Sequence, residues 1–326
     1  MKVAVTGASG HVGNNLCRAL IERGFSVKAL IHRDGSSLAN LNLFRLHADV
    51  LDVASLEKAF FDVDAVFHLA AKISIDGDPD GSVMRVNVEG TRNVVQACIN
   101  CKVKRLVYFS ACHVFDQEPL DEELDERRNF VGAKAFPYER SKVEAEKEVY
   151  KGIEKGLDAV LVHPTSIIGP YDYKPSLLGK ALVYLYNCRL ASIVSGGFDW
   201  VDARDVAHAS IDALEKGKKG ERYLLSGTWT TAKQLSEIVE KITGKKAPTH
   251  TAPVWLTKLM LPLAKFYSKL SHSPTLYTKE ALNVLIKSNP HIKSKKARKE
   301  LGYAPRPLET TIRDTYDWFK ERGRIY

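Results

Sequence analysis

The sequence predicts an α/β protein with a doubly wound parallel sheet and a smaller, mostly helical C-terminal lobe. The short apolar run Lys2–Thr6 leads through a glycine turn into a helical pattern over His11–Arg23. Strand-like and helix-like segments then alternate as far as a sixth strand at Asp158–His163, which is typical of parallel sheets covered by helices. Beyond it the alternation weakens, and we expect Leu177–Asn187 to begin the second lobe.

The expected strands divide the chain into two parts. In chain order, the remaining sheet segments are expected at Ser26–Ile31, Leu43–Ala48, Ala65–Ala71, Arg105–Ser110, a strand followed by a helix at Val201–Leu214, and a strand at Arg222–Leu225. We therefore expect the sheet domain to hold residues 1–165 and about 196–226, and a substrate-binding lobe to hold about 166–195 and 227–326.

The composition is that of an ordinary globular protein, since 44% of the 326 residues are hydrophobic and 27% are charged. The formal net charge of +9 is concentrated in residues 287–306, which carry seven basic residues and one acidic residue. Only one aromatic residue, Tyr303, interleaves with these charges. We therefore expect a solvated helix and tail there, and no nucleic-acid partner.

Cysteine content and hydropathy bear on the compartment. The five cysteines show no disulfide framework, which favours a reducing cytoplasm, and no metal-ligand set has suitable spacing. We expect no signal peptide and no transmembrane segment. The apolar helix Pro253–Leu270 is interrupted by lysines and is expected to pack over the substrate cleft rather than on a membrane surface. We expect a monomer or a homodimer.

The glycine turn predicts a dinucleotide site. Gly7 allows a tight turn, Gly10 lets the backbone approach a pyrophosphate, and Gly13 lets the helix pack close to the strand. Free N–H groups at the start of the helix would then bind the phosphates. The candidate cofactor residues of this segment are Thr6, Gly7, Ser9, Gly10, His11, Val12 and Gly13.

The end of the second strand bears on the choice of cofactor. His32 and Arg33 stand where NADP sites place a cation for the 2′-phosphate, and the forked donors of arginine suit a phosphate. Asp34 follows and could bind the ribose of NAD. The pattern favours NADP, with NAD possible. At the end of the fourth strand, the small residues Ala70 and Ala71 would let a cofactor lie across the sheet edge.

Several motifs together resemble one family. TGASGHVG, HLAA, VNVEGTRN, YERSK, HPTSIIGP and SKKARKELGY resemble an extended short-chain dehydrogenase/reductase of the NAD(P)-dependent epimerase/dehydratase superfamily. They are most similar to the group of dihydroflavonol reductases and 3β-hydroxysteroid dehydrogenases. The resemblance implies a Rossmann-like fold, contact between Asp49 and the adenine ring, and a proline loop under the nicotinamide. The other positions placed in the cofactor site are Val50, Leu69, His163, Pro164 and Thr165.

The resemblance also implies the catalytic residues. Tyr138 and Lys142 lie on one helical face, and Tyr138 would act as the acid/base. Lys142, together with the cationic oxidised nicotinamide, would lower the pKa of the phenol, and it would hold the nicotinamide ribose. Asn87 would support the site through a bound water, and it could also tie its helix to a neighbouring strand. We expect His68 to be a packed strand residue rather than a base.

One position departs from the family pattern. Ala111 stands where the family has a Ser or Thr that bonds the substrate carbonyl, and Ser110, Cys112 and His113 are the nearby polar candidates. Loss of such a donor can cost on the order of 10²–10³ in rate. Three hypotheses remain: an NADP-dependent reductase of an aldehyde or ketone on a fairly apolar small molecule, an NAD-dependent nucleotide-sugar epimerase or dehydratase, and a cofactor-binding protein with weak or no catalysis.

Overall fold

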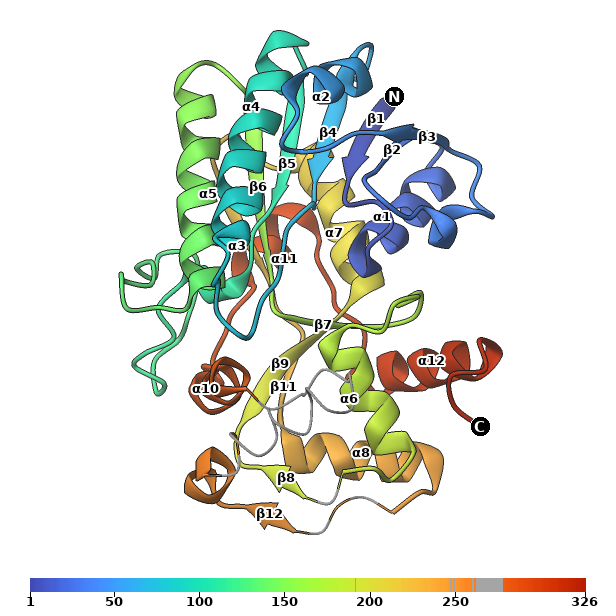
Figure 1. Cartoon of the computed structure of the whole chain (residues 1–326), viewed down its shortest axis with the longest axis vertical. Coiled ribbons are helices and arrows are strands. Elements are labelled where there is room, and N and C mark those ends of the chain that lie inside the picture. The colour runs from blue at the N-terminus through green and yellow to red at the C-terminus, as the bar shows by residue number, and fades with distance from the viewer. Residues whose placement is uncertain (191, 247, 249, 260, 262–277) are drawn as a thin grey trace.

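The computed structural model describes the whole chain except residues 191, 247, 249, 260 and 262–277. Within the described residues, seven parallel strands form the central sheet in the order β10-β6-β5-β4-β1-β2-β3 (Figure 1). This confirms the doubly wound sheet. The strands are β1 (Lys2–Thr6), β2 (Ser26–Ile31), β3 (Phe44–His47), β4 (Ala65–His68), β5 (Arg105–Phe109), β6 (Ala159–Pro164) and β10 (Arg222–Leu225).

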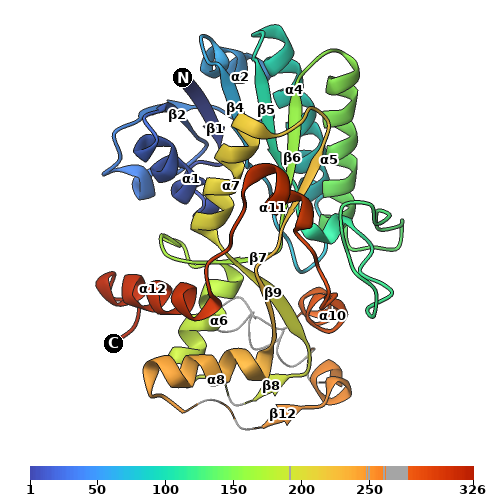
Figure 2. The ribbon, with the colours of Figure 1, turned by 180° about the vertical axis from the view of Figure 1, so that it is seen from behind.

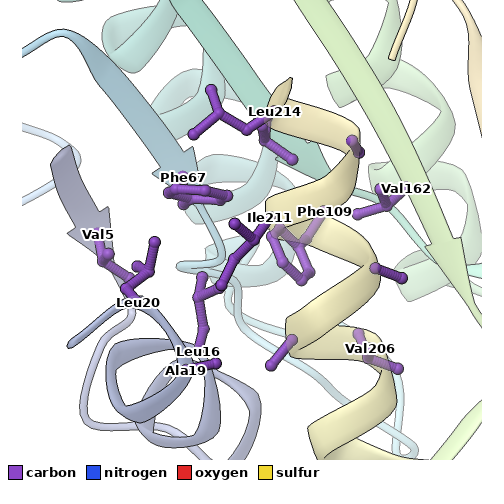
Figure 3. Packing of buried hydrophobic residues seen from close by; sticks show 14 of the residues in the cluster. Val5, Leu16, Ala19, Leu20, Phe67, Phe109, Val162, Val206, Ile211 and Leu214 are labelled. Carbon is purple, nitrogen blue, oxygen red and sulfur yellow. The ribbon is translucent and has the colours of Figure 1, made fainter. Parts of the chain in front are cut away.

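Helices cover both faces of the sheet because neighbouring strand residues point to opposite sides. One face packs against α1 (His11–Glu22), α7 (Ala203–Lys216) and α11 (Lys295–Leu301), which lie in front in Figure 2. The other packs against α2 (Val53–Phe60), α4 (Gly90–Asn100) and α5 (Pro137–Glu154). Val3 and Val5 join the first core, and Ala4 joins the second. Figure 3 shows Leu16 of α1 and Ile211 of α7 packing over the strands.

The second lobe contains small β-sheets in addition to the helices that the sequence predicts. β9 (Gly197–Asp202) pairs in parallel with β7 (Ser166–Ile168) and antiparallel with β11 (Thr228–Thr231). Helices α6 (Leu177–Tyr186), α8 (Ala232–Thr243) and α12 (Leu308–Glu321) enclose an apolar core with this sheet. This part of the chain also contains the parallel pair β8 (Ile193–Val194) and β12 (Thr251–Ala252), and α10 (Lys279–Lys287). Strands β8 and β12 are too short to show a clear alternation of apolar and polar residues in the sequence.

The apolar stretch Pro253–Leu270 is only partly described. Residues 260 and 262–270 lie outside the described residues, so its packing over a cleft stays a prediction. In the described part, Trp255 and Leu259 are 68% and 66% exposed. Across the described ranges, we find no helix with both the length and the apolar character needed to cross a bilayer.

The helical segment that carries Asn87 contains a π-helical turn. The segment consists of α3 (Ser82–Met84), the turn η2 (Arg85–Glu89) and α4. A π-turn inserts an extra residue into the helix and rotates the side chains within it. The buried Asn87 lies in this turn.

The glycine turn after β1 fits tightly against the end of β4. Gly7 has a φ of +68°, and a Cβ atom at this position would lie 2.8 Å from the amide nitrogen of Ala70. A Cβ atom at Gly13 would lie 2.2 Å from the carbonyl oxygen of Gly7. The tight turn and the close packing predicted for these two glycines are therefore present.

We expect Gly7→Ala to lower the free energy of unfolding by about 2–5 kcal/mol, because left-handed strain and overpacking add. Gly24 is the matched control, since its φ is +79° and no atom lies within 4 Å of an added Cβ. Gly24→Ala should cost only about 1 kcal/mol. Urea unfolding of both variants measures the difference, and equal losses would contradict the role assigned to the contact with Ala70.

Candidate active site

The start of α1 has the character of an anion site. Gly10 precedes the helix, no side chain caps it, and the first turn has no acidic residue. The N–H groups of this turn and the helix dipole therefore suit a phosphate. The His11 ring has other partners, because its Nε2 atom lies 3.1 Å from the carbonyl oxygens of Gly169 and Pro170. Its side chain joins the glycine turn to the loop after β7.

The tip of β2 presents an unpaired cation. His32 lies 3.6 Å from the Asp49 carboxylate, and both side chains are exposed. Asp34 accepts hydrogen bonds from Lys174 at 2.8 Å and from the Ser36 amide at 2.9 Å, and these bonds hold its pKa below the usual value. Arg33 is exposed and makes no hydrogen bond or ion pair with the described residues. Its guanidinium is therefore available to an anion.

Asp49 and Val50 also take part in hydrogen bonds within the protein. Asp49 accepts a hydrogen bond from the Leu51 amide at 2.9 Å, and the carbonyl of Val50 accepts one from Asn93 at 3.0 Å. At the end of β4, Leu69 and Ala70 are half-buried and Ala71 is exposed. The backbone here is held by Thr6, as described next.

A buried hydrogen-bond chain begins at the end of β1. The Thr6 hydroxyl accepts from the amides of Leu69 and Ala70, both at 3.1 Å, and lies 2.8 Å from Nδ1 of His68. Nε2 of His68 lies 3.0 Å from the Thr91 hydroxyl, which donates its proton to the carbonyl of Asn87. The imidazole proton therefore sits on Nε2. Burial lowers the pKa of His68 to about 3, so this residue is a neutral packed side chain, as predicted.

Asn87 extends the chain to α5. Its amide group donates to the Ser141 hydroxyl at 2.8 Å and to the carbonyl of Lys72 at 3.0 Å, and its oxygen accepts from the Lys72 amide at 2.7 Å. Ser141 donates in turn to the carbonyl of Tyr138 at 2.6 Å. Asn87 therefore ties its helical segment to the loop after β4 and to α5, rather than to a neighbouring strand as we expected.

Tyr138 and Lys142 lie on the first turns of α5. Tyr138 is half-buried and Lys142 is buried. Lys142 donates to the carbonyl of Phe109 at 2.6 Å, and burial lowers its pKa to about 8, while Glu146 acts in the opposite direction. Burial, with a smaller contribution from Glu139, raises the pKa of Tyr138 to about 12.

The direction of the Tyr138 shift differs from the expectation. We expect Lys142 and the oxidised nicotinamide together to lower the pKa of the phenol, whereas among the protein's own groups loss of hydration dominates and raises it. The ammonium group instead binds a backbone carbonyl at the end of β5. At neutral pH the phenol therefore keeps its proton.

Ser110 and His163 share a buried carboxylate. The Ser110 hydroxyl donates to Oε1 of Glu146, and Nε2 of His163 lies 2.7 Å from the same oxygen. Arg222 lies 3.7 Å from Oε2. Although burial acts to raise it, the pKa of Glu146 is lowered by His163, Ser110 and Arg222 together. The structure thus places Ser110 and His163 in a cluster around an ionised Glu146.

The segment after β6 connects the sheet to β9. Pro164 is buried in β6, and Thr165 donates to the Asp199 carboxylate at 2.6 Å. The Gly227 amide binds the same carboxylate oxygen at 2.7 Å. Burial raises the pKa of Asp199 to about 6. The Thr165 side chain is therefore part of the link between the sheet and β9.

Sequence reasoning missed Glu146. A signal was present, because Glu146 follows Lys142 by one helical turn and Tyr138 by two. The three side chains share one face of α5. Arg222 could not be found in this way, since only the pairing of β10 with β6 brings it to the cluster.

Comparisons with known proteins agree on one family. Residues 3–226 match the family model described as NAD dependent epimerase/dehydratase family. The chain is 34% identical to "Sterol demethylase protein B" of Methylococcus capsulatus, with 100% of both chains covered. It is 28% identical to "Putative dihydroflavonol 4-reductase" of Synechocystis sp., with 98% of this chain and 95% of the relative covered.

Solved structures show the same architecture. The crystal structure of gox2253 has a TM-score of 0.86 at 32% identity and covers 99% of both chains. UDP-glucose 4-epimerase of Thermotoga maritima has a TM-score of 0.80 and covers 99% of both chains, and at 20% identity it shows the fold alone.

We expect Glu146→Ala to lower the free energy of unfolding by about 3–5 kcal/mol, because the substitution leaves a buried cluster without its central charge. Glu144, on the same helix, is the matched control, since its side chain is 45% exposed and among the described residues it pairs only with Lys147. Glu144→Ala should cost less than about 1 kcal/mol. Chemical denaturation of both variants tests this, and a small loss in both would show that the Glu146 charge is dispensable for stability.

Proposed function

Because this chain belongs to the NAD dependent epimerase/dehydratase family and is an NAD(P)-dependent enzyme, we propose that it reduces an aldehyde or ketone on a fairly apolar small molecule with NADPH. The observation that carries the proposal is the pair Tyr138 and Lys142 on one face of α5, beside the end of β5. Parallel sheets of this type bind ligands at the carboxyl ends of their strands. The pair is therefore in the right place for chemistry on a bound carbonyl.

The protonation states of the pair suit reduction. When bound, the nicotinamide supplies the hydride that reaches the carbonyl carbon. Tyr138 keeps its proton at neutral pH and would donate it to the carbonyl oxygen, so that the phenol O–H bond breaks as the alcohol O–H bond forms. Lys142 has a pKa of about 8 and is mostly charged at pH 7, so it would favour the phenolate that remains.

The cofactor choice rests on the tip of β2. The unpaired Arg33 would bind the 2′-phosphate of NADPH, while Asp34 is engaged by Lys174 and the Ser36 amide. The start of α1 would hold the pyrophosphate through its uncapped N–H groups. Asp49 would contact the adenine ring. Residues 163–165 would approach the nicotinamide through their backbone, because the His163 and Thr165 side chains are bound elsewhere.

The substrate class rests on the relatives and on the second lobe. Relatives carry the names dihydroflavonol 4-reductase, cinnamoyl-CoA reductase 1 and sterol demethylase protein B, and a dihydroflavonol, a cinnamoyl group and a sterol each contain carbon rings. We assign the lobe of residues 166–195 and 227–326, apart from α11 on the central sheet, to substrate binding. Its described residues expose Trp255 and Leu259, which would suit an apolar ring.

A substrate screen tests the reductase against the epimerase alternative. NADPH oxidation would be followed with a panel of aryl aldehydes, flavanone-type ketones and 3-ketosteroids. Calorimetry with UDP-glucose and a dTDP-sugar in the presence of NAD would run in parallel. Turnover of a ring ketone supports the proposal, whereas tight nucleotide-sugar binding without carbonyl turnover would overturn it.

We expect Arg33→Ala to weaken NADPH binding about 10- to 100-fold, since one charge-assisted contact to the 2′-phosphate is lost. The dissociation constant for NADH should stay within about two-fold of wild type, as NADH lacks this phosphate. Arg313 is the matched control, because it is exposed on α12. Fluorescence titration of each variant with both cofactors gives the constants. A wild type that prefers NADH would refute the assignment.

We expect Tyr138→Phe to lower kcat by at least about 10²-fold while NADPH affinity changes little, because only the proton donor is removed. The chain contains its own control in Tyr316 and Lys320, which have the same spacing on α12. Tyr316 donates to the carbonyl of Leu182 in the core of the lobe. Tyr316→Phe should keep the wild-type kcat. Steady-state kinetics with a ketone that the enzyme reduces give kcat for each variant. A wild-type kcat in Tyr138→Phe would contradict the role of Tyr138 as the proton donor.

A further inference from the structure

We propose that His113 donates the hydrogen bond to the substrate carbonyl oxygen that a hydroxyl at position 111 would otherwise supply. This inference rests on the proposed reductase function and names one more catalytic residue for it. Four residues at the end of β5 are close enough in sequence to be considered for this hydrogen bond, namely Ser110, Ala111, Cys112 and His113. The structure separates them by their partners and their burial.

Ser110 and Ala111 do not offer a free donor. The Ser110 side chain is buried, and its single hydroxyl proton is given to Glu146. Ala111 has extended backbone, with φ of −148° and ψ of 151°, and its methyl group carries no polar atom. Consecutive residues of an extended segment point to opposite sides, so Ser110 and Ala111 face opposite ways.

Cys112 is directed into the core. Together with Val114 it belongs to a buried cluster that includes Val143 of α5 and Leu224 of β10. Burial raises the pKa of the Cys112 thiol to about 12, and its sulfur lies 4.0 Å from the Gln117 amide nitrogen. A buried thiol in such a cluster is a poor donor to a ligand.

His113 is directed away from that cluster. Residues 112–114 form the single 3₁₀ turn η3, in which successive side chains are about 120° apart. Since Cys112 and Val114 are both buried, the third direction belongs to His113, which is half-buried. This turn packs against α5, the helix that carries Tyr138. The imidazole is therefore at the accessible side of the carboxyl end of β5.

The His113 ring has an unused donor of the right kind. Neither ring nitrogen makes a hydrogen bond with the described residues. Burial lowers the pKa of His113 to about 4, so at neutral pH the ring is uncharged and carries one N–H group. A neutral N–H donor replaces a serine hydroxyl without adding charge. It can stabilise the oxygen as negative charge develops there.

The test uses the full chain, NADPH and a carbonyl substrate that the screen shows to be reduced. His113→Ala should lower kcat/KM about 10²- to 10³-fold, and NADPH affinity should stay within about two-fold. His113→Gln, which keeps an N–H donor, should retain at least a tenth of the activity. His291→Ala is the matched control, because His291 is exposed and its ring makes no hydrogen bond or ion pair with the described residues.

The decisive variant restores a hydroxyl at position 111. Ala111→Ser introduced into His113→Ala should recover activity at least about ten-fold, because the new hydroxyl occupies the vacated role. A structural role of His113 would not be repaired in this way. Activity of His113→Ala within two-fold of wild type would overturn the proposal, as would a loss that Ala111→Ser leaves unchanged or that comes with loss of NADPH binding. Normal turnover in Tyr138→Phe would instead refute the reductase mechanism itself.

Discussion

The buried hydrogen bonds from Thr6 to Ser141 are the constraint on which the site depends. A buried polar group without a partner costs about 1–3 kcal/mol, so each member of the chain requires the next. Thr6 holds the backbone after β4, His68 connects it to Thr91, and Asn87 carries the connection to α5. The glycine turn, the β4 end and the helix with Tyr138 thus keep fixed relative positions.

The charged side chains around α5 also depend on one another. Lys142 is buried and would lose its proton readily, but Glu146 one turn away opposes that loss. Glu146 in turn stays ionised because His163, Ser110 and Arg222 surround it. The Ser110 hydroxyl already donates its single proton to Glu146. Ser110, which is next to position 111, therefore has no proton left to donate to a substrate carbonyl. His113 is the candidate that remains.

Two connections join the sheet to the elements that follow it. His11 and Asn15, both on α1, bind the carbonyl of Pro170. Thr165 and Gly227 bind the carboxylate of Asp199, which lies in the middle of β9. The central sheet domain is therefore held to the elements after β6 by these short segments.

The sequence by itself determined the sheet, the glycine turn and the face of α5 that carries Tyr138 and Lys142, because these depend on local periodicity and on spacing within one element. It also located the ambiguity at Ala111. Only the tertiary structure decided that Ser110 is bound to Glu146, that Arg222 reaches the same cluster, and that burial raises the pKa of Tyr138. Those outcomes depend on which strands become neighbours and on how much water the packed side chains exclude. Both are properties of the assembled fold, and the sequence of a single segment does not determine them.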